Sequence, residues 1–330
     1  MRFQRLSIPV VFLVLFSQCS QQSTDQSAQR TWAQLECTGA PHARHECSFV
    51  EVDGKFYLLG GRGIKPVDIF DPKTNTWTQG AEPPIEVHHF QAVAYQGKVY
   101  VMGGMTGKYP HEDPIAQIVI YDPAEDVWEM GDSIPSDRQR GGAGVVVSGN
   151  SAYILSGITD GHWEGHVKWV DRYNFESGEW TTLKDAPRAR DHFHAALYSG
   201  KIYCAAGRNS SAKTEETFNL TIPEVDVYDI ATNSWTTLPA EQNIPTERAG
   251  TTALFLEDKL LVIGGESAAQ ETAHAEVEAY DVSESKWTKL EMLERGRHGA
   301  QAILYNKSVY IAAGCGNRGG KPELDTIEKY

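Results

Sequence analysis

The sequence predicts an all-β protein of six four-stranded units that stack into a closed ring, and three observations support this fold class. An apolar strand that ends in a small-residue doublet recurs six times, and an arginine and a tryptophan keep fixed distances from landmarks in the repeated unit. The sixth unit lacks its last strand, and the N-terminal part of the chain contains a matching segment. With 41% hydrophobic residues, 10% aromatic residues and 30 glycines, the composition suits a folded β-protein.

The first 30 residues differ from the remainder and have the pattern of a targeting segment. Arg2 and Arg5 precede an apolar run, residues 6–16, which is shorter than the ~20 residues of a membrane-spanning helix but suits a signal peptide. We therefore expect a signal peptide at 1–18 and a polar tether at 19–30. Both features predict export, to the periplasm or to the outer cell surface.

Cys19 stands at the end of this leader. The arrangement resembles a bacterial lipoprotein leader, in which the cysteine is acylated, although Gln18 stands where that family usually has a small residue. The resemblance implies lipidation of Cys19, with the membrane reached by that anchor only. The alternative is an ordinary cleaved signal with an incidental cysteine.

The first two strands of each unit surround a tight turn. In the second unit they are expected at 90–95 and 98–104, and the second strand ends in the doublet. The six doublets are Gly60-Gly61, Gly103-Gly104, Ser156-Gly157, Ala206-Gly207, Gly264-Gly265 and Ala313-Gly314. Seventeen residues before the second member of each doublet stand Arg44, Val87, Arg140, Arg190, Arg248 and Arg297. The invariant spacing means that the turn within this segment keeps one length.

The third and fourth strands, expected at 116–122 and 127–131 in the second unit, carry an aromatic residue and a tryptophan. A tryptophan follows each aromatic by seven residues at Trp77, Trp128, Trp180, Trp235 and Trp287. These large side chains are expected to pack between neighbouring sheets, because a single four-stranded sheet cannot bury both of its faces. Their role is structural.

The sixth unit stops at Tyr330, before its tryptophan. Trp32 lies in the N-terminal segment 31–35, which matches the fourth strand of the other units. We expect this segment to complete the last sheet, so that the ring has no free edge at the closure. The repeat resembles the kelch motif over residues 31–330, of the exported bacterial type, and the resemblance implies a six-bladed kelch β-propeller.

Two connections per unit vary in length, and in an antiparallel sheet both emerge on the same face, here called the top face. Variable loops on a rigid scaffold commonly carry recognition. The residues that open the first strand of each unit are expected to surround the mouth of the central channel. The candidate ligand-binding residues there are Arg44, His45, His88, His89, Arg140, Arg190, His192, Arg248, Arg297 and His298.

A ring of arginines on a chain of formal charge −14 would select an anionic ligand, such as a carboxylate. The same net charge argues against a nucleic-acid partner, which requires a basic face. The alternative role for each arginine is structural pairing with an acid such as Glu46 or Asp191.

The sequence offers little support for a metal or cofactor site. His162 and His166 flank Glu164 in a segment expected to be a long surface loop, and their order is not that of a zinc protease, so no metal site and no cofactor are predicted. A kelch copper oxidase that acts on galactose has seven blades and tyrosine ligands near its axis, so the resemblance does not extend to it.

Four cysteines follow Cys19. Cys204 lies at an apolar strand position and is expected to be a buried thiol. Cys37, Cys47 and Cys315 are expected at the top of the closure between the last unit and the first. In an oxidising compartment one pair could form a disulfide, and Cys37–Cys47 is slightly preferred.

Two functions remain open. The first is a recognition module that binds an acidic saccharide or a protein partner on the top face, as a monomer. The second is a sugar-acid epimerase or mutarotase, because a sialic-acid epimerase is an exported six-bladed kelch protein. Such an enzyme needs an acid and a base, and His88, His89, His192 and Glu46 are candidates.

Overall fold

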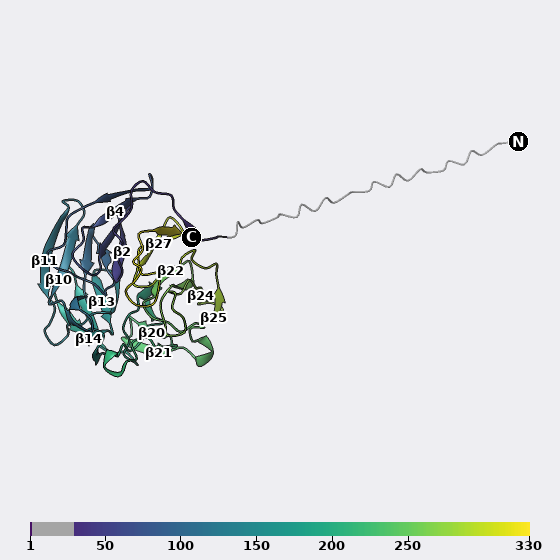
Figure 1. Ribbon diagram of the computed structural model, residues 1–330. Helices are drawn as coiled ribbons and strands as arrows, with labels where there is room; N and C mark the ends of the chain where they lie inside the picture. Colours follow the sequence, from purple (N-terminus) through teal and green to yellow (C-terminus); the bar gives the residue numbers. More distant parts are fainter. Residues whose placement is uncertain (2–29) are drawn as a thin grey trace. The chain divides into compact units, whose positions relative to one another are not determined.

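Six four-stranded antiparallel sheets follow one another around a ring in the computed structural model, which describes Met1 and residues 30–330 (Figure 1). The ring belongs to the unit Thr31–Tyr330. The predicted signal peptide and tether, including Cys19, lie outside the described residues apart from Met1 and Arg30. Two short 3-10 helices, Ala212–Thr214 and Ala240–Gln242, interrupt the connections. None of the helices in the described part of the chain has the length and apolar character of a membrane span.

We call the sheets blades A to F and number their strands from the channel outwards. Blade A contains β2 (Cys47–Val52), β3 (Lys55–Gly60), β4 (Asp68–Asp71) and β5 (Thr76–Gln79). Blade B contains β6 (Val93–Tyr95), β7 (Lys98–Val101), β10 (Gln117–Asp122) and β11 (Val127–Ser133). Blade C contains β12 (Gly144–Ser148), β13 (Ser151–Leu155), β16 (Val170–Asn174) and β17 (Trp180–Thr182).

The second half of the ring repeats this order. Blade D contains β18 (Ala195–Tyr198), β19 (Lys201–Cys204), β20 (Asp226–Asp229) and β21 (Ser234–Thr237). Blade E contains β22 (Thr252–Leu256), β23 (Lys259–Ile263), β24 (Val277–Asp281) and β25 (Lys286–Lys289). Blade F contains β26 (Ala302–Tyr305), β27 (Ser308–Ala312), β28 (Ile327–Lys329) and β1 (Ala33–Gln34). Inner strands of neighbouring blades contact one another all around the channel, including β26 and β2 across the closure.

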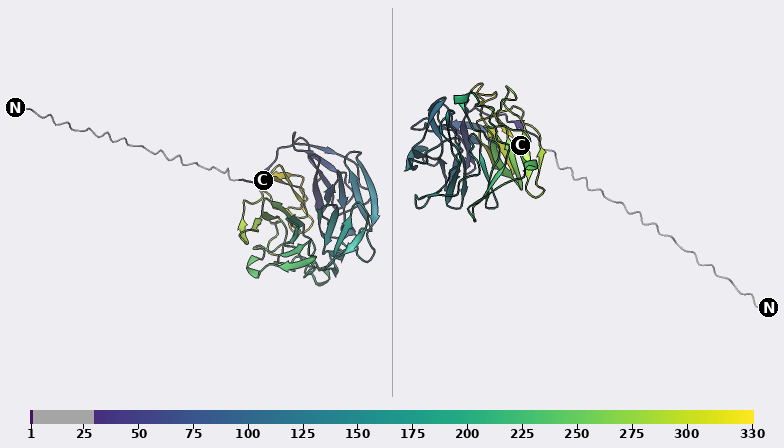
Figure 2. Two further views of the ribbon diagram at one scale, coloured as in Figure 1. Left: turned by 180° about the vertical axis from the view of Figure 1, so that it is seen from behind. Right: turned by 90° about the horizontal axis from the view of Figure 1, so that it is seen from below.

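The N-terminal strand closes the ring, as the sequence predicts. β1 pairs antiparallel with β28, with Ala33 opposite Lys329, and the yellow last blade lies beside the purple first blade in Figures 1 and 2. Trp32 is buried, and its ring centroid lies 5.2 Å from that of Tyr330. The segment therefore supplies both the outer strand of blade F and part of its apolar packing.

The second member of each doublet is glycine because the chain folds back on itself there. A Cβ atom at Gly157 would lie 2.7 Å from the carbonyl oxygen of Gly141, and one at Gly207 would lie 2.9 Å from that of Asp191. The first member also has a left-handed backbone, and in three blades it is Ser156, Ala206 or Ala313, with φ angles of 56–61°. In blades A and E a Cβ atom at this position would lie 2.7 Å from the carbonyl oxygen of Val87, at Gly60, and 2.2 Å from that of Arg297, at Gly264, so these two blades need glycine there as well.

The five column arginines are buried inside the blades, and this corrects the prediction that they line the channel mouth. Arg44, Arg140, Arg190, Arg248 and Arg297 are each 0–2% exposed. In blade D, Arg190 donates to the carbonyl oxygen of Ala206 at 2.7 Å and to Oδ2 of Asp226 at 2.5 Å. Because a buried guanidinium needs every donor satisfied, these side chains hold the doublet against the third strand and are not available to a ligand.

Each arginine has a carboxylate partner at one position of the third strand, two residues before the aromatic residue. The pairs are Arg44–Asp68, Arg140–Asp171, Arg190–Asp226, Arg248–Glu278 and Arg297–Glu328. Blade B has Val87 and Val119 at these two positions, and both are fully buried. The arginine and its acid are thus replaced together by apolar residues.

Two top-face connections, expected from the sequence to be loops, contain β-hairpins. β8 (Met105–Lys108) pairs with β9 (His111–Pro114) above blade B, and β14 (Ile158–Asp160) pairs with β15 (Glu164–His166) above blade C. The second hairpin holds His162 in its turn, whereas the sequence predicted that His162 lies in a long surface loop. It is only 7% exposed.

The predicted Cys37–Cys47 disulfide is absent, since Cys37, Cys47, Cys204 and Cys315 are free thiols. Cys47 opens β2, where its Sγ lies 3.7 Å from the carbonyl oxygen of Gly299, and burial raises the pKa of this thiol to about 12. Cys37 instead follows β1 and lies close to Leu35 and to Trp77 of β5, the outer strand of blade A. Cys47 thus lies on an inner strand, beside the channel, whereas Cys37 lies beside an outer strand, at the periphery of the ring.

Candidate functional site

A ring of left-handed residues surrounds the channel mouth, two positions after the arginine column. These residues have φ angles between 52° and 64°, and they are Glu46, His89, Gly142, His192, Gly250 and Gly299. From His89 onwards, the backbone amide of each ring residue donates to the carbonyl oxygen of the ring residue in the preceding blade, for example from His89 to Glu46 at 3.1 Å and from Gly142 to His89 at 2.8 Å. Cys47 closes the ring by donating to the carbonyl of Gly299.

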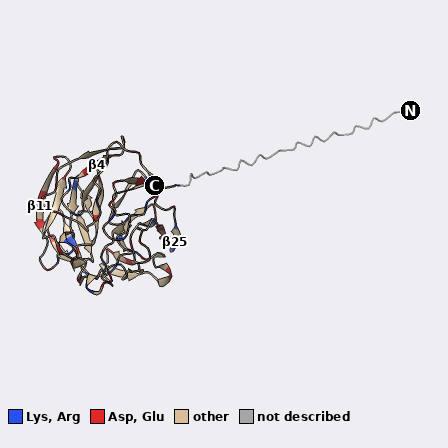
Figure 3. Ribbon diagram, viewed as in Figure 1, with Lys and Arg blue, Asp and Glu red and all other residues tan. Residues whose placement is uncertain are grey.

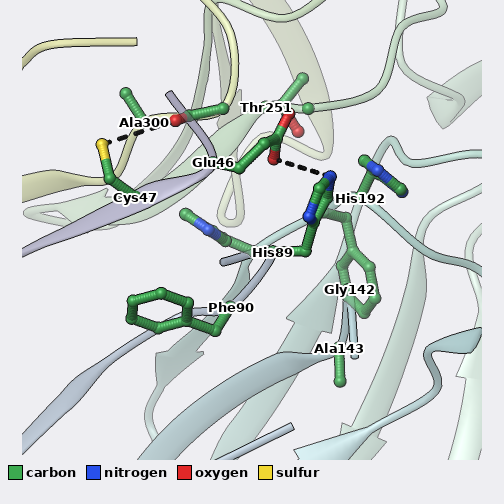
Figure 4. A pocket seen from close by; sticks show the side chains of 13 residues that line it. Glu46, Cys47, His89, Phe90, Gly142, Ala143, His192, Thr251 and Ala300 are labelled. Carbon is green, nitrogen blue, oxygen red and sulfur yellow. Dashed lines mark hydrogen bonds and ion pairs between the residues drawn. The ribbon is translucent and has the colours of Figure 1, made fainter. Parts of the chain in front are cut away.

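Three of these six positions are glycine, as the left-handed backbone favours, and three carry functional side chains. A left-handed backbone costs a non-glycine residue about 1–3 kcal/mol, and such strain clusters at functional sites. Figure 4 shows the Glu46 side chain directed toward the histidines at the channel mouth; its Oε2 lies 3.6 Å from Nε2 of His89. Glu46, His89 and His192 are therefore the first members of the candidate site.

Above this ring lies a cavity of about 550 Å³, which we call the top-face cavity. All six blades contribute to it, through the connections between their second and third strands and through the residues that open the inner strands. Its charged and aromatic lining residues are His45, Glu46, Arg62, His89, Tyr109, His162, Arg208, Phe218, Glu266, His298, Arg318 and Lys321. A volume of this size is typical of sites for small molecules.

Cationic groups dominate the cavity, although the surface of the ring as a whole is mixed and carries acidic residues around its outside, including on β11 (Figure 3). Arg62 pairs with Glu112 at 2.6 Å and Arg208 pairs with Glu266 at 2.7 Å. The guanidinium of Arg318 lies 5.4 Å from the centroid of the Phe218 ring and donates to a backbone carbonyl. No carboxylate partner of Arg318 is found among residues 30–330.

His298 is a charged histidine inside this cavity. Burial opposes its protonation, but the carboxylates of Glu266 and Glu46 outweigh burial and raise the pKa of His298 to about 9. Its Nε2 lies 3.4 Å from Glu266 and its Nδ1 lies 3.7 Å from Glu46. Burial would raise the pKa of Glu266, yet His298 and Arg208 hold it at about 2. The site thus keeps one imidazolium between two carboxylates near neutral pH.

Three further histidines meet beside Glu46. One ring nitrogen from each of His89, His162 and His192 lies within 4.8 Å of those of the other two. All three side chains are buried. Burial lowers the pKa of His89 and of His162, so both imidazoles are neutral near neutral pH. Neutral imidazoles are the form that binds metal ions. This group of three histidines has the composition of a metal centre, which was not predicted from the sequence.

The structure thus brings together only part of the predicted set. His45, His89, His192 and His298 line the mouth or the cavity, whereas the five arginines do not. His88 lies behind His89, fully buried, with its Nε2 3.1 Å from the carbonyl oxygen of Gly107. Burial and the charge of Arg62 lower the pKa of His88 to about 4.

Several residues of the site were missed, namely Arg62, Glu112, His162, Arg208, Phe218, Glu266, Arg318 and Lys321. Most come from connections of unequal length, so no repeat position identifies them. Glu46, His89 and His192 could have been recognised from the sequence, because they stand at a repeat position that is glycine in the other three units. The acid that pairs with each arginine could also have been recognised from the sequence. The one unit with valine in place of the arginine, at Val87, also has valine in place of the acid, at Val119.

Comparison with known proteins agrees with this architecture. The Attractin/LZTR1 β-propeller model matches residues 69–318, and the kelch motif model matches residues 43–84. The Kelch-like protein terF of Aspergillus terreus is 26% identical over 324 residues, covering 92% of this chain and 68% of that protein. The human Kelch-like protein 23 is 26% identical over 278 residues, covering 83% of this chain.

The chain spans 46% of the length of Kelch-like protein 23. Among solved structures, that of YjhT superimposes with a TM-score of 0.74 at 16% sequence identity, covering 88% of this chain and 95% of YjhT. This likeness concerns the fold alone. Because a family model matches more than half of the chain and six blades with the expected strand order are present, the chain belongs to the Attractin/LZTR1 β-propeller family and is a six-bladed propeller of the kelch type.

Proposed function

We propose that this propeller is a binding module whose top-face cavity takes a small anionic ligand, with the carboxylate of an acidic saccharide as the first candidate. Kelch propellers typically serve as binding or protein-interaction modules, which agrees with this assignment. The volume of the cavity favours a small molecule over a protein segment. The sequence also predicts that a protein partner could bind the same face and that the chain is a monomer, and both remain predictions.

The observation that carries the proposal is the excess of cations in the cavity. Five positively charged groups line it, and they are Arg62, Arg208, Arg318, Lys321 and the protonated His298. The carboxylates that face them are Glu46 and Glu266, with Glu112 behind Arg62. An anion is attracted by the remaining positive charge, and a guanidinium can bind a carboxylate through two parallel hydrogen bonds. These cations replace the buried arginines in the binding role expected from the sequence.

The test is calorimetric titration of the full chain with sialic acid, with glucuronate and with the neutral sugar glucose. We expect the acidic sugars to bind and glucose not to bind. The double variant Arg318→Ala, Lys321→Ala should weaken binding at least tenfold, because neither cation has a carboxylate partner among the described residues. The matched control, Lys289→Ala on the exposed outer strand β25, changes net charge without touching the cavity. Equal binding of glucose, or unchanged binding by the double variant, would refute the proposal.

A second candidate function is a sugar-acid epimerase or mutarotase, and His298 is the observation that favours it. A protonated imidazole lies between the carboxylates of Glu46 and Glu266, so a general acid and a general base face one cavity. Proton magnetic resonance of freshly dissolved sialic-acid anomers decides between binding and catalysis. Accelerated equilibration that is lost in His298→Gln supports the enzyme, and equilibration at the uncatalysed rate rejects it.

We also propose that the chain is exported and anchored through an acylated Cys19. The support is the leader pattern of the sequence, in which two arginines and an apolar run precede the cysteine. A propeller on a polar tether would then present its cavity outside the cytoplasm.

A further inference from the structure

The histidine cluster beside Glu46 draws its three members from three different blades. His89 precedes the inner strand of blade B, His192 precedes that of blade D, and His162 lies in the turn between β14 and β15 of blade C. Their exposed fractions are 5%, 6% and 7%. Residues so far apart in the sequence reach one point only because the ring closes around it.

A hydrogen bond at Nδ1 fixes the proton on two of these rings. The Nδ1 of His162 lies 3.1 Å from both carboxylate oxygens of Glu112, and the Nδ1 of His192 contacts Oδ1 of Asp191. An ionised carboxylate can only accept a hydrogen bond, so each Nδ1 carries the proton and donates it. In a neutral imidazole the Nε2 atom then has a free lone pair.

The third ring is fixed by a chain of three groups. The carbonyl oxygen of Gly107 accepts a hydrogen bond from Nε2 of His88, so the Nδ1 of neutral His88 is an acceptor. It accepts from Nδ1 of His89, at 2.6 Å. The Nε2 of His89 therefore also has a lone pair, and this buried atom has no hydrogen-bond partner among the described residues.

Each of the three neighbouring rings consequently has a lone pair at Nε2. Those of His162 and His192 face each other at 3.0 Å, a distance at which two lone pairs repel unless a cation or a proton lies between them. Two imidazole nitrogens bound to one tetrahedral Zn²⁺ at 2.0–2.1 Å are about 3.3 Å apart. The observed separation is close to that value, and one ring nitrogen from each of the three histidines lies within 4.8 Å of those of the other two.

We infer that His89, His162 and His192 bind one divalent transition-metal ion through their Nε2 atoms, with Zn²⁺ as the first candidate. Imidazole nitrogen is a preferred ligand of Zn²⁺ and Cu²⁺, and three histidines leave at least one coordination position open, as in catalytic zinc sites. Glu112, Asp191 and His88 are the outer hydrogen-bond partners that orient the ligand rings.

The cluster borders the top-face cavity, because His89 and His162 belong to the lining of that cavity. Glu46, whose Oε2 is 3.6 Å from Nε2 of His89, is placed to accept a hydrogen bond from a metal-bound water or to become a fourth ligand. An oxygen of an anionic ligand could occupy the same position. The inference stands whether or not the cavity binds an acidic sugar, and its test uses the metal alone.

The competing explanation is a single proton shared between His162 and His192, which would join the two Nε2 atoms without any metal. Under that explanation the three imidazoles do not together hold one ion when Zn²⁺ is added. The number of ions bound per chain and the number of histidine ligands on the bound ion therefore separate the two explanations.

The experiment uses the full chain without a polyhistidine tag, stripped with a chelator and titrated with Zn²⁺ in competition with a chromophoric chelator. We expect one high-affinity ion per chain, and a loss of at least a hundredfold in affinity for His162→Gln. The matched control is His274→Gln, which removes an equally buried histidine that contacts Ser267 and Glu276 outside the cluster. Asp191→Asn should weaken Zn²⁺ binding by about 10–100-fold, because it removes an outer-partner charge but leaves the ligands.

X-ray absorption of the zinc-loaded wild type gives a result that does not depend on any variant folding. Three imidazole ligands at about 2.0–2.1 Å support the site. Fewer than three histidine ligands, no stoichiometric binding, or affinity retained in a folded His162→Gln variant would each overturn it. Circular dichroism of each variant establishes that it is folded before its affinity is compared.

Discussion

Arg190 donates from Nη2 to Oδ2 of Asp226 at 2.5 Å, and both side chains are only 1% exposed. This ion pair inside blade D is repeated in four other blades, whereas blade B has Val87 and Val119 in its place. The arginine column of the repeat therefore joins the glycine doublet to the third strand. It does not bind a ligand.

The first prediction concerns this buried pair. Arg190→Ala leaves the Asp226 carboxylate buried without its partner, and we expect it to lower the free energy of unfolding by about 3–5 kcal/mol. The double variant Arg190→Val, Asp226→Val copies blade B and should be close to the wild type or more stable. Urea denaturation measures both. The control is Lys201→Ala, an exposed cation of the same blade, and a single variant within about 1 kcal/mol of the wild type would contradict the structural role.

The second prediction concerns the left-handed backbone at Glu46, whose φ is 53°. Glu46→Gly should be more stable than Glu46→Ala by about 1 kcal/mol, because glycine adopts this conformation without strain and alanine does not. Thermal unfolding of the two variants gives the difference. At Leu304, on the exposed face of strand β26, the order should reverse. Equal stabilities at position 46 would show that the ring of left-handed residues carries no strain.

The third prediction is a pH dependence that His298 causes. Its pKa is raised from the ordinary value of 6.5 to about 9, so its charge stabilises the fold fully below pH 6.5, and this contribution is lost as pH rises through about 9. The melting temperature of the wild type should therefore fall between pH 7 and pH 10. In His298→Gln the fall should be smaller. If the two proteins show parallel curves over this range, His298 is not the titrating group.

The fourth prediction tests the closure of the ring. Trp32→Ala removes a side chain that is 4% exposed and packs on Tyr330, so we expect a loss of about 3–5 kcal/mol in the free energy of unfolding. Gln34→Ala, which changes an exposed residue of the same strand, should have little effect. Denaturant titration followed by tryptophan fluorescence compares them. Similar losses for both variants would argue against the packing role of Trp32.

The fifth prediction addresses the leader. In a bacterial host, the wild-type chain should incorporate labelled palmitate and sediment with membranes, whereas Cys19→Ala should do neither. Cys204→Ala, which removes a buried thiol of blade D, is the matched control. Unlabelled wild-type protein would leave the ordinary cleaved signal as the explanation.

The repeat made most of the fold predictable. Fixed spacings from Arg190 to Gly207 and from Tyr228 to Trp235 report strands joined by turns of constant length, and such turns keep the register of a sheet. The position of Trp32 was predictable for the same reason, since the last blade lacks one strand. The leader, residues 1–30, does not belong to the repeat, so no repeated spacing supports its assignment.

The site was only partly predictable, and His162 shows why. It lies in a connection whose length varies from blade to blade, so the repeat gives it no position, and a hairpin of β14 and β15 carries it to His89 and His192. The arginines were assigned to the wrong role because a sequence position near the channel mouth does not say whether a long side chain points into the channel or back into its own blade. Burial and hydrogen bonding decide that direction.

By itself, the sequence determined the number of blades, their strand order and the closure by the N-terminal strand, because these follow from local turn chemistry and apolar periodicity that recur in register. Only the tertiary structure decided which polar side chains meet. The three histidines and Glu46 come from separate blades, and their mutual distances depend on the curvature of the closed ring and on connections of unequal length. Neither quantity is encoded in the spacing of residues along a single repeat.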